Sequence, residues 1–227
     1  MGLALKVTKR VNGFFLRAAW EMDNEILILF GHSGAGKSMT LQLIAGLMDP
    51  DEGFIRSEGK VLFNRSAGIN LPPQQRSMGY VFQDRVLFPH MTVYANIAYG
   101  LREGGQAEKK AKVKEMISIL HLEGLEKKYP GEISGGQKQR VTLARSLIGR
   151  PDCLLLDEPF SALDNPLRQE MWRFLREIQS RFRIPVVLVT HDIFEAYTLA
   201  DKVVVYDGGR VLWIGPPEEI FDRREVL

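Results

Sequence analysis

The stretch GHSGAGKS, residues 31–38, is the feature that most constrains what this 227-residue chain can fold into. It fits the pattern G-x-x-x-x-G-K-[ST] and lies between the apolar run EILILF (25–30) and the amphipathic segment SMTLQLIAGL (38–47). This order predicts a buried strand, a glycine-rich loop and a helix whose N-terminus binds phosphate. A glycine-rich turn with an incidental Lys-Ser pair is the alternative, and the flanking strand and helix argue against it.

Individual residues of this loop have predicted roles. Gly31, Gly34 and Gly36 let the chain curl so that backbone N–H groups point at an anion. We expect Lys37 to reach the β and γ phosphates of a nucleoside triphosphate, and the Ser38 hydroxyl to ligate Mg²⁺. The predicted nucleotide contacts in this segment are Gly31, His32, Ser33, Gly34, Ala35, Gly36, Lys37, Ser38 and Met39.

Short apolar runs alternate with helical segments along the chain, which predicts an α/β fold with a mostly parallel core sheet. CLLLDE (153–158) and PVVLVTH (185–191) indicate two more central strands with polar residues at their carboxyl ends. Such ends are where α/β sheets bind ligands. KVVVYDGGRVLWIG (202–215) predicts a hairpin, and LALKVTKR (3–10) with GFFLRAAWEM (13–22) predicts a peripheral antiparallel layer.

The middle of the chain has a helical pattern. AEKKAKVKEMISILHL (107–122) carries an apolar stripe that consists of Val113, Met116, Ile117 and Leu120. We therefore expect a single domain over 1–227, with a catalytic core formed by 1–85 and 150–227 and a helical subdomain over 86–149.

Composition and apolar segments give no support for a nucleic-acid partner or for a membrane span in this chain. Lys and Arg number 30 against 28 Asp and Glu, so the charge gives no argument for nucleic acid as a partner. The single cysteine, Cys153, fits a reducing cytoplasm and is expected to be a buried thiol. No apolar stretch approaches the roughly 18 residues of a membrane span, and the N-terminus lacks the apolar region of a signal peptide.

A second motif, LLLDEP (154–159), is an apolar run that ends in two acids. We expect Asp157 to hold Mg²⁺, directly or through water, as the partner of Ser38. Glu158 is placed to orient or deprotonate an attacking water. A strand that ends in an acidic turn is common by itself, but not downstream of a phosphate-binding loop.

A third motif, ISGGQKQR (133–140), places adjacent glycines at a predicted helix start. Each glycine costs the helix up to about 1 kcal/mol relative to alanine, so we expect a ligand to approach the backbone there. Together the three motifs resemble the ATP-binding cassette (ABC) family, and the resemblance covers nearly the whole chain. It implies that Ser134, Gly135, Gly136 and Gln137 bind the γ-phosphate of an ATP held by a second cassette, with Ile133 in place of the usual leucine.

The resemblance implies further site residues. Gln83 in YVFQD resembles the Q-loop glutamine, which senses Mg²⁺ and the γ-phosphate, and His191 in VLVTHD resembles the switch histidine. SALD (161–164) resembles the D-loop, whose Asp164 would contact the nucleotide site across the dimer interface. A lone glutamine or histidine at a strand end is usually structural, and only the order of the motifs along the chain favours catalysis.

An aromatic residue near the first strands normally stacks on adenine in this family. Phe14 is the candidate, with Phe15 close behind, and a core role for either stays open.

The stretch 77–101 resembles that of importer ATPases for molybdate, tungstate or sulfate. There the family has a groove for a helix of the membrane subunit, which Val86, Leu87, Phe88 and Met91 could line, although an ordinary core is the alternative. The resemblance implies a head-to-tail homodimer, transmembrane permease subunits, indirectly a solute-binding protein, and a peripheral location on the cytoplasmic face of the cell membrane. We expect the tail after Gly215 to be too short for the regulatory domain of many relatives.

Two other functions would leave different marks on the sequence. A soluble ABC ATPase acting on DNA or ribosomes would usually show two cassettes or a long coiled-coil insertion. A nucleotide-binding module without hydrolysis would be expected to lack Glu158 or His191, and both are present. The motor of an exporter stays open, because importers and exporters share this chemistry.

Overall fold

The computed structural model describes residues 2–83, 87–101 and 104–221. Its strands are β1 (Leu3–Val11), β2 (Phe14–Met22), β3 (Ile26–Phe30), β4 (Glu52–Ser57), β5 (Lys60–Asn64), β6 (Ile69–Asn70), β7 (Met78–Val81), β8 (Cys153–Asp157), β9 (Val186–Thr190), β10 (Lys202–Asp207) and β11 (Arg210–Gly215). Its helices are α1 (Lys37–Ala45), η1 (Pro73–Gln75), α2 (Val93–Ala98), α3 (Gln106–Ile119), η2 (Pro130–Glu132), α4 (Gly135–Leu147), α5 (Asn165–Phe182), α6 (Ile193–Leu199) and α7 (Pro217–Phe221).

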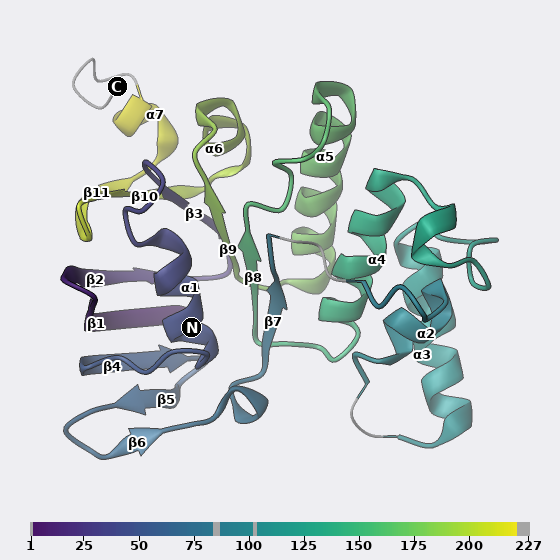
Figure 1. The fold of residues 1–227 in the computed structure, drawn as a ribbon, viewed down its shortest axis with the longest axis horizontal. Helices are drawn as coiled ribbons and strands as arrows, with labels where there is room; N and C mark the ends of the chain where they lie inside the picture. Colours follow the sequence, from purple (N-terminus) through teal and green to yellow (C-terminus); the bar gives the residue numbers. More distant parts are fainter. Residues whose placement is uncertain (1, 84–86, 102–103, 222–227) are drawn as a thin grey trace.

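The strands form one sheet in the order β6-β5-β4-β1-β2-β11-β10-β3-β9-β8-β7 (Figure 1). From β10 to β7 neighbouring strands are parallel, and from β6 to β2 they are antiparallel. The predicted α/β class is confirmed. The antiparallel strands continue the core sheet, because β11 joins β2 through the single parallel pair Arg210 and Arg17.

The parallel strands are buried on both faces. Along β3, Ile26 and Ile28 belong to one hydrophobic cluster, whereas Leu27 and Leu29 belong to another. Successive side chains of a strand point to opposite faces, so a strand covered on both sides is apolar throughout. The second cluster includes α1 and also contains Cys153, which is fully buried as expected.

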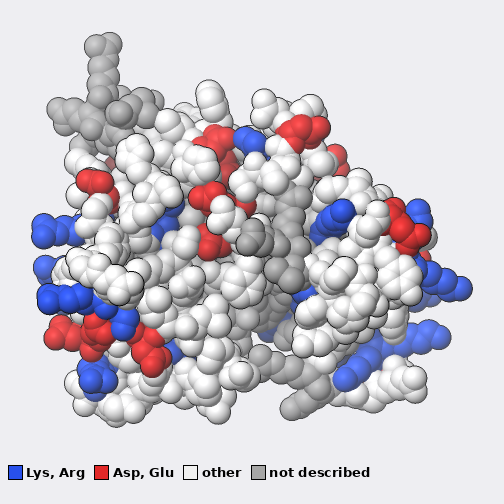
Figure 2. All heavy atoms as spheres, viewed as in Figure 1, with Lys and Arg blue, Asp and Glu red and all other residues white. Residues whose placement is uncertain are grey.

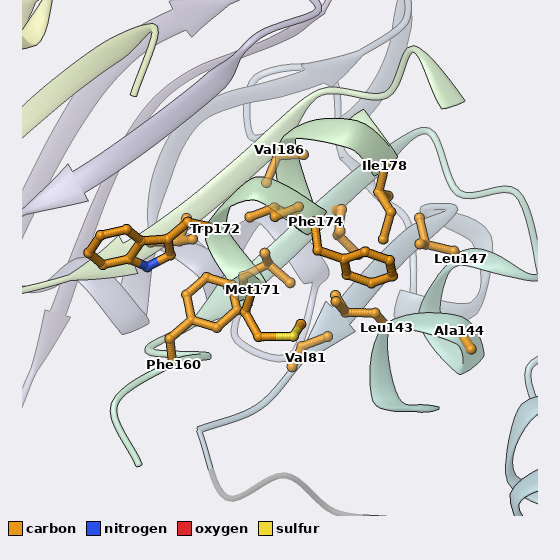
Figure 3. Packing of buried hydrophobic residues seen from close by; sticks show 14 of the residues in the cluster. Val81, Leu143, Ala144, Leu147, Phe160, Met171, Trp172, Phe174, Ile178 and Val186 are labelled. Carbon is orange, nitrogen blue, oxygen red and sulfur yellow. The ribbon is translucent and has the colours of Figure 1, made fainter. Parts of the chain in front are cut away.

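Helices α4 and α5 cover the opposite face of these strands. Figure 3 shows Met171 and Phe174 of α5 near Leu143 and Leu147 of α4, with Val81 of β7 in the same cluster. The second half of α4 thus packs on the α/β core, whereas its start, which carries the third motif, meets α5 where Gly136 lies against Leu167.

The described chain between β7 and β8 contains helices and no strand, and these helices gather at one end of the molecule (Figure 1). The apolar stripe of α3 is buried as predicted, with Val113 and Leu120 fully inaccessible to solvent.

The hairpin of β10 and β11 is also confirmed. Gly208 and Gly209 occupy its turn with φ angles of 50° and 80°, which non-glycine residues rarely adopt in succession.

On the face shown in Figure 2, basic and acidic side chains are interspersed. Among the described residues, no helix combines the length and apolar character needed to span a membrane.

A buried cation caps the C-terminal end of α1. The guanidinium of Arg76 is fully buried and donates hydrogen bonds to the carbonyl oxygens of Leu71, Leu43 and Ile44 and to Oδ1 of Asn70. Leu43 and Ile44 lie in the last turn of α1, where carbonyls lack helical partners and a positive charge is favoured. Arg76 therefore fixes the end of the helix that follows the phosphate-binding loop.

Arg76→Met should lower the free energy of unfolding by roughly 2–4 kcal/mol, because it removes the guanidinium that donates to the carbonyl oxygens of Leu71 and Ile44 and to Oδ1 of Asn70. Urea denaturation followed by circular dichroism measures the change. The exposed Arg65 provides the control, because Arg65→Met should shift stability by less than about 0.5 kcal/mol. Equal midpoints for the two variants would contradict the assigned role.

Candidate functional site

The glycine-rich loop connects β3 to α1 in the predicted order. Gly31 and Gly36 have φ angles of 144° and 103°. A Cβ at Gly31 would lie 2.2 Å from the carbonyl oxygen of Tyr206, and one at Gly36 would lie 2.7 Å from Cδ1 of Leu16. Both positions therefore require glycine, and the loop directs the N-terminus of α1 toward the space where an anion would bind.

Lys37 is the first residue of α1 and its ammonium is held by the loop. Nζ donates to the carbonyl oxygens of Gly31 at 2.6 Å and His32 at 2.7 Å. Burial lowers the pKa of Lys37, while the nearby carboxylates of Glu158 and Asp157 oppose that shift. The side chain thus places a cation between the loop and two acids, where phosphate oxygens would be attracted.

Ser38 and Asp157 meet although 119 positions separate them in sequence. The Ser38 hydroxyl donates to Oδ1 of Asp157 at 2.8 Å, and the Tyr80 hydroxyl lies 3.4 Å from Oδ2. Burial raises the pKa of Asp157, whereas the hydrogen bonds from Ser38 and Tyr80 lower it. Tyr80 was not predicted as a site residue.

The donor set fits Mg²⁺, which prefers oxygen ligands and binds proteins through one or two side chains together with phosphates and water. The hydroxyl of Ser38 and the carboxylate of Asp157 are such ligands, and they are already adjacent. In the described part of the chain, no group of three His, Cys, Asp or Glu residues could hold a metal by itself.

Glu158 follows β8 with a φ of 44°, and its N–H donates to the carbonyl of Val189. Nε2 of Gln83 donates to Oε2 of Glu158 at 3.3 Å, and Nδ1 of His191 lies 3.3 Å from Oε1. The three predicted catalytic residues therefore meet at one carboxylate, that of Glu158.

A cleft of about 600 Å³ brings the predicted residues together. Its lining consists of Phe14, His32, Ser33, Gly34, Gly36, Lys37, Ser38, Met39, Gln83, Glu158 and His191. Phe14 at the start of β2 lies close to Gly36, since a Cβ there would be 3.4 Å from its ring. Phe15 points to the other side of β2 and lines a different hollow with residues of β11. The geometry favours Phe14 over Phe15 for stacking on adenine, and that role stays a prediction.

The lining of this cleft does not include the third motif. Ser134 caps α4 by accepting from the N–H of Gln137, whose side chain accepts from the N–H of Ser134 in return. A Cβ at Gly136 would lie 2.7 Å from Cδ1 of Leu167, so any larger residue would have to displace the end of that side chain of α5. Packing against α5 therefore favours glycine at this position, a reason that the sequence argument missed.

Asp164 also lies outside the described lining of the cleft. It caps α5, and its Oδ1 accepts from the N–H of Leu167.

The residues predicted to line a docking groove differ in how deeply they are buried. Val86 lies outside the described residues. Leu87 is buried in the main hydrophobic cluster, which supports the core alternative for that residue, whereas Phe88 and Met91 are half-buried.

A second cleft, of about 850 Å³, lies next to Phe88, between α4, the end of α2 and β7. Its lining is Ser77, Met78, Gly79, Tyr80, Tyr99, Gly100, Leu101, Glu108, Lys112, Arg145, Ser146, Ile148, Gly149, Arg150 and Pro151. Tyr99 is 63% exposed there, and its ring packs edge-on against Phe88 at 4.6 Å.

The sequence argument also missed a buried acid beside His191. Glu195 of α6 is 4% exposed, and burial raises its pKa to about 7. Hydrogen bonds from Thr190 and Trp172 act in the opposite direction and lower the pKa. An acid in the first turn of a helix is ordinarily solvated, so the sequence held no signal for this burial.

Known proteins resemble this chain in both sequence and fold. The model of the ABC transporter family matches residues 22–161. The molybdate/tungstate import ATP-binding protein WtpC of Archaeoglobus fulgidus is 42% identical over 224 residues, which are 99% of this chain and 91% of the relative. A solved structure of cbiO1 from Clostridium perfringens, part of the ABC transporter complex cbiONQ, has a TM-score of 0.83 at 28% identity, and the match covers 99% of this chain and 92% of that one.

Two longer relatives are also similar. The molybdenum import ATP-binding protein ModC of Vibrio cholerae is 44% identical over 88% of this chain, and the sulfate/thiosulfate import ATP-binding protein CysA of Xylella fastidiosa is 41% identical over 98%. The matches span 54% and 65% of the lengths of those two proteins.

Proposed function

The chain belongs to the ABC transporter family, and we propose that it is the ATP-hydrolysing subunit of an importer for an oxyanion such as molybdate, tungstate or sulfate. It is an ATPase. The observation that carries the proposal is the cleft in which the glycine-rich loop meets Gln83, Glu158 and His191. The proposal that the solute is an oxyanion rests on the relatives, which are import proteins for molybdate, tungstate or sulfate.

Each group of this cleft has a task in hydrolysis. The loop and Lys37 bind the phosphates, and Glu158 accepts a proton from the attacking water while Gln83 and His191 hold its carboxylate. Ser38, Asp157 and Gln83 would hold Mg²⁺, which when bound neutralises charge on the phosphate oxygens.

The complete site requires a second copy of the chain. Ser134, Gly135, Gly136, Gln137 and Asp164 lie outside the lining of the cleft, which supports their action on an ATP held by the other subunit of a head-to-tail homodimer. Each subunit would be one domain, with the helices between β7 and β8 as its helical subdomain.

The second cleft is the proposed docking site for a transmembrane permease. It is large, and its exposed Tyr99 stands beside the half-buried Phe88, which suits a helix with an apolar side. The subunit would then sit peripherally on the cytoplasmic face of the membrane and act with a solute-binding protein through the permease.

Deletion of the gene in its own organism should abolish high-affinity uptake of one oxyanion, measured with labelled molybdate, tungstate and sulfate. Wild-type protein should restore uptake, and Glu158→Gln should not. Normal uptake of all three oxyanions in the deletion strain would contradict the proposed solute class.

The same strain tests the docking site. Tyr99→Glu should fail to restore uptake although the purified variant keeps its basal ATPase activity. Tyr197→Glu is the matched control, because Tyr197 is 49% exposed on α6 and lies outside the lining of both clefts. Equal uptake with the two variants would place the permease elsewhere.

A further inference from the structure

The position of His191 is set by its neighbours in the chain. Its side chain is 63% exposed, and among the described residues its ring has one hydrogen-bonding contact, the 3.3 Å approach to Glu158. An imidazole with so little packing around it takes its position from the backbone that carries it. The anchoring of residues 190 and 192 therefore decides where the ring lies.

Thr190, which precedes His191, forms hydrogen bonds with Asp192, which follows it, and with Glu195 of α6. Its Oγ1 accepts a hydrogen bond from the N–H of Asp192 at 3.0 Å and donates its own hydrogen to Oε2 of Glu195. The other carboxylate oxygen, Oε1, accepts from Nε1 of Trp172 at 3.1 Å. A buried carboxylate thus links the loop of His191 to α5.

Asp192 provides a second anchor. Its Oδ1 caps α6, and its Oδ2 pairs at 2.9 Å with Arg168 of α5, which also donates to the carbonyl oxygen of Leu163. The His191 loop and the segment before Asp164 are therefore held by the same helix.

These anchors border the catalytic groups directly. The lining of a small hollow of about 80 Å³ includes Glu158 and His191 together with the anchoring residues Arg168, Thr190, Asp192 and Glu195. A shift of Glu195 would thus act on the loop that forms one wall of the site.

We propose that Glu195 is a positioning residue for ATP hydrolysis, which fixes His191 against Glu158 through the Thr190 hydroxyl. The inference rests on the proposed function, because it assumes that His191 acts in hydrolysis. Stability alone gives a weak reason for the residue, since burying a carboxyl group is unfavourable and an apolar side chain of similar size would pack without that penalty. A catalytic loop that must be held in place supplies the missing reason.

The test measures single-turnover ATP hydrolysis and ATP affinity for Glu195→Gln, with and without His191→Ala. The amide of Gln keeps the size of Glu but cannot accept from both Thr190 and Trp172. We expect Glu195→Gln to lower the rate by roughly tenfold with ATP affinity within about twofold. In the His191→Ala background, it should cause no further fall, because a residue that acts through His191 has nothing left to position.

A second pair of variants removes the link from its other end. Thr190→Val deletes the hydroxyl and should match the loss of Glu195→Gln, whereas Thr190→Ser keeps the hydroxyl and should retain the wild-type rate. Gln179→Met is the control, because Gln179 is also a nearly buried polar residue but forms its hydrogen bonds with Asn24 and not with the His191 loop. This variant should leave the rate of hydrolysis unchanged.

An equal fall caused by Glu195→Gln with and without His191 would overturn the inference, and so would wild-type activity in Thr190→Val. A wild-type protein that fails to hydrolyse ATP would instead contradict the proposed function. Thermal unfolding of each variant separates lost folding from lost positioning, and the Thr190 pair decides the matter if Glu195→Gln does not fold.

Discussion

Glu158→Gln is expected to lower the rate of ATP hydrolysis by roughly 10²–10⁴-fold while ATP still binds. The carboxylate of Glu158 lies 3.3 Å from both the Gln83 amide nitrogen and Nδ1 of His191, so it is held where a water could be deprotonated. An amide keeps the size of the side chain and cannot accept the proton. Single-turnover hydrolysis and the affinity for a fluorescent ATP analogue measure the two quantities separately.

The same variant should change the assembly. If Ser134 binds the ATP of the other subunit, ATP holds two chains together and hydrolysis releases them. Glu158→Gln should therefore be monomeric without nucleotide and dimeric with ATP in sedimentation. Adding Ser134→Arg should abolish the dimer, whereas adding Ser66→Arg, at an exposed serine in a turn, should preserve it.

Two results would count against this assembly. A Glu158→Gln protein that stays monomeric in saturating ATP contradicts the shared site. A dimer that survives Ser134→Arg shows that the start of α4 does not hold the nucleotide of its partner.

The elements around the nucleotide cleft could be predicted because their signals are local. An apolar run before GHSGAGKS and an amphipathic run after it define β3, the loop and α1 within about twenty residues. The acids at the end of β8 follow from the same logic, since a strand that turns polar at its carboxyl end marks the ligand side of a parallel sheet.

Features that depend on distant contacts could not be predicted. The burial of Arg76 requires the end of α1, and that of Glu195 requires Trp172, so neither charged residue differs in sequence from a solvated one. The packing of Leu167 against Gly136 is likewise invisible before the helices are placed. The sequence also could not decide whether Leu87 lines a docking groove or belongs to the core, because an apolar residue outside a regular repeat fits both roles.

Lys37→Ala is expected to abolish hydrolysis mainly by weakening ATP binding, because it removes the side-chain cation held by the glycine-rich loop. Hydrogen bonds to charged groups contribute roughly 1.5–3 kcal/mol each, so a single lost phosphate contact should weaken ATP binding by about 10–150-fold.

The loss from Lys37→Ala should be largest for ATP, smaller for ADP and small for AMP, because Lys37 is assigned to the β and γ phosphates. Collapse of the loop, whose carbonyls at Gly31 and His32 lose their donor, would weaken all three nucleotides alike. Calorimetric titration with the three nucleotides distinguishes these causes, circular dichroism checks the fold, and the exposed Lys6→Ala serves as the control. Near-native ATP affinity in a folded Lys37→Ala protein would refute the assigned role of Lys37 in binding ATP, because the loss of a charged hydrogen-bond donor to the phosphates should lower that affinity.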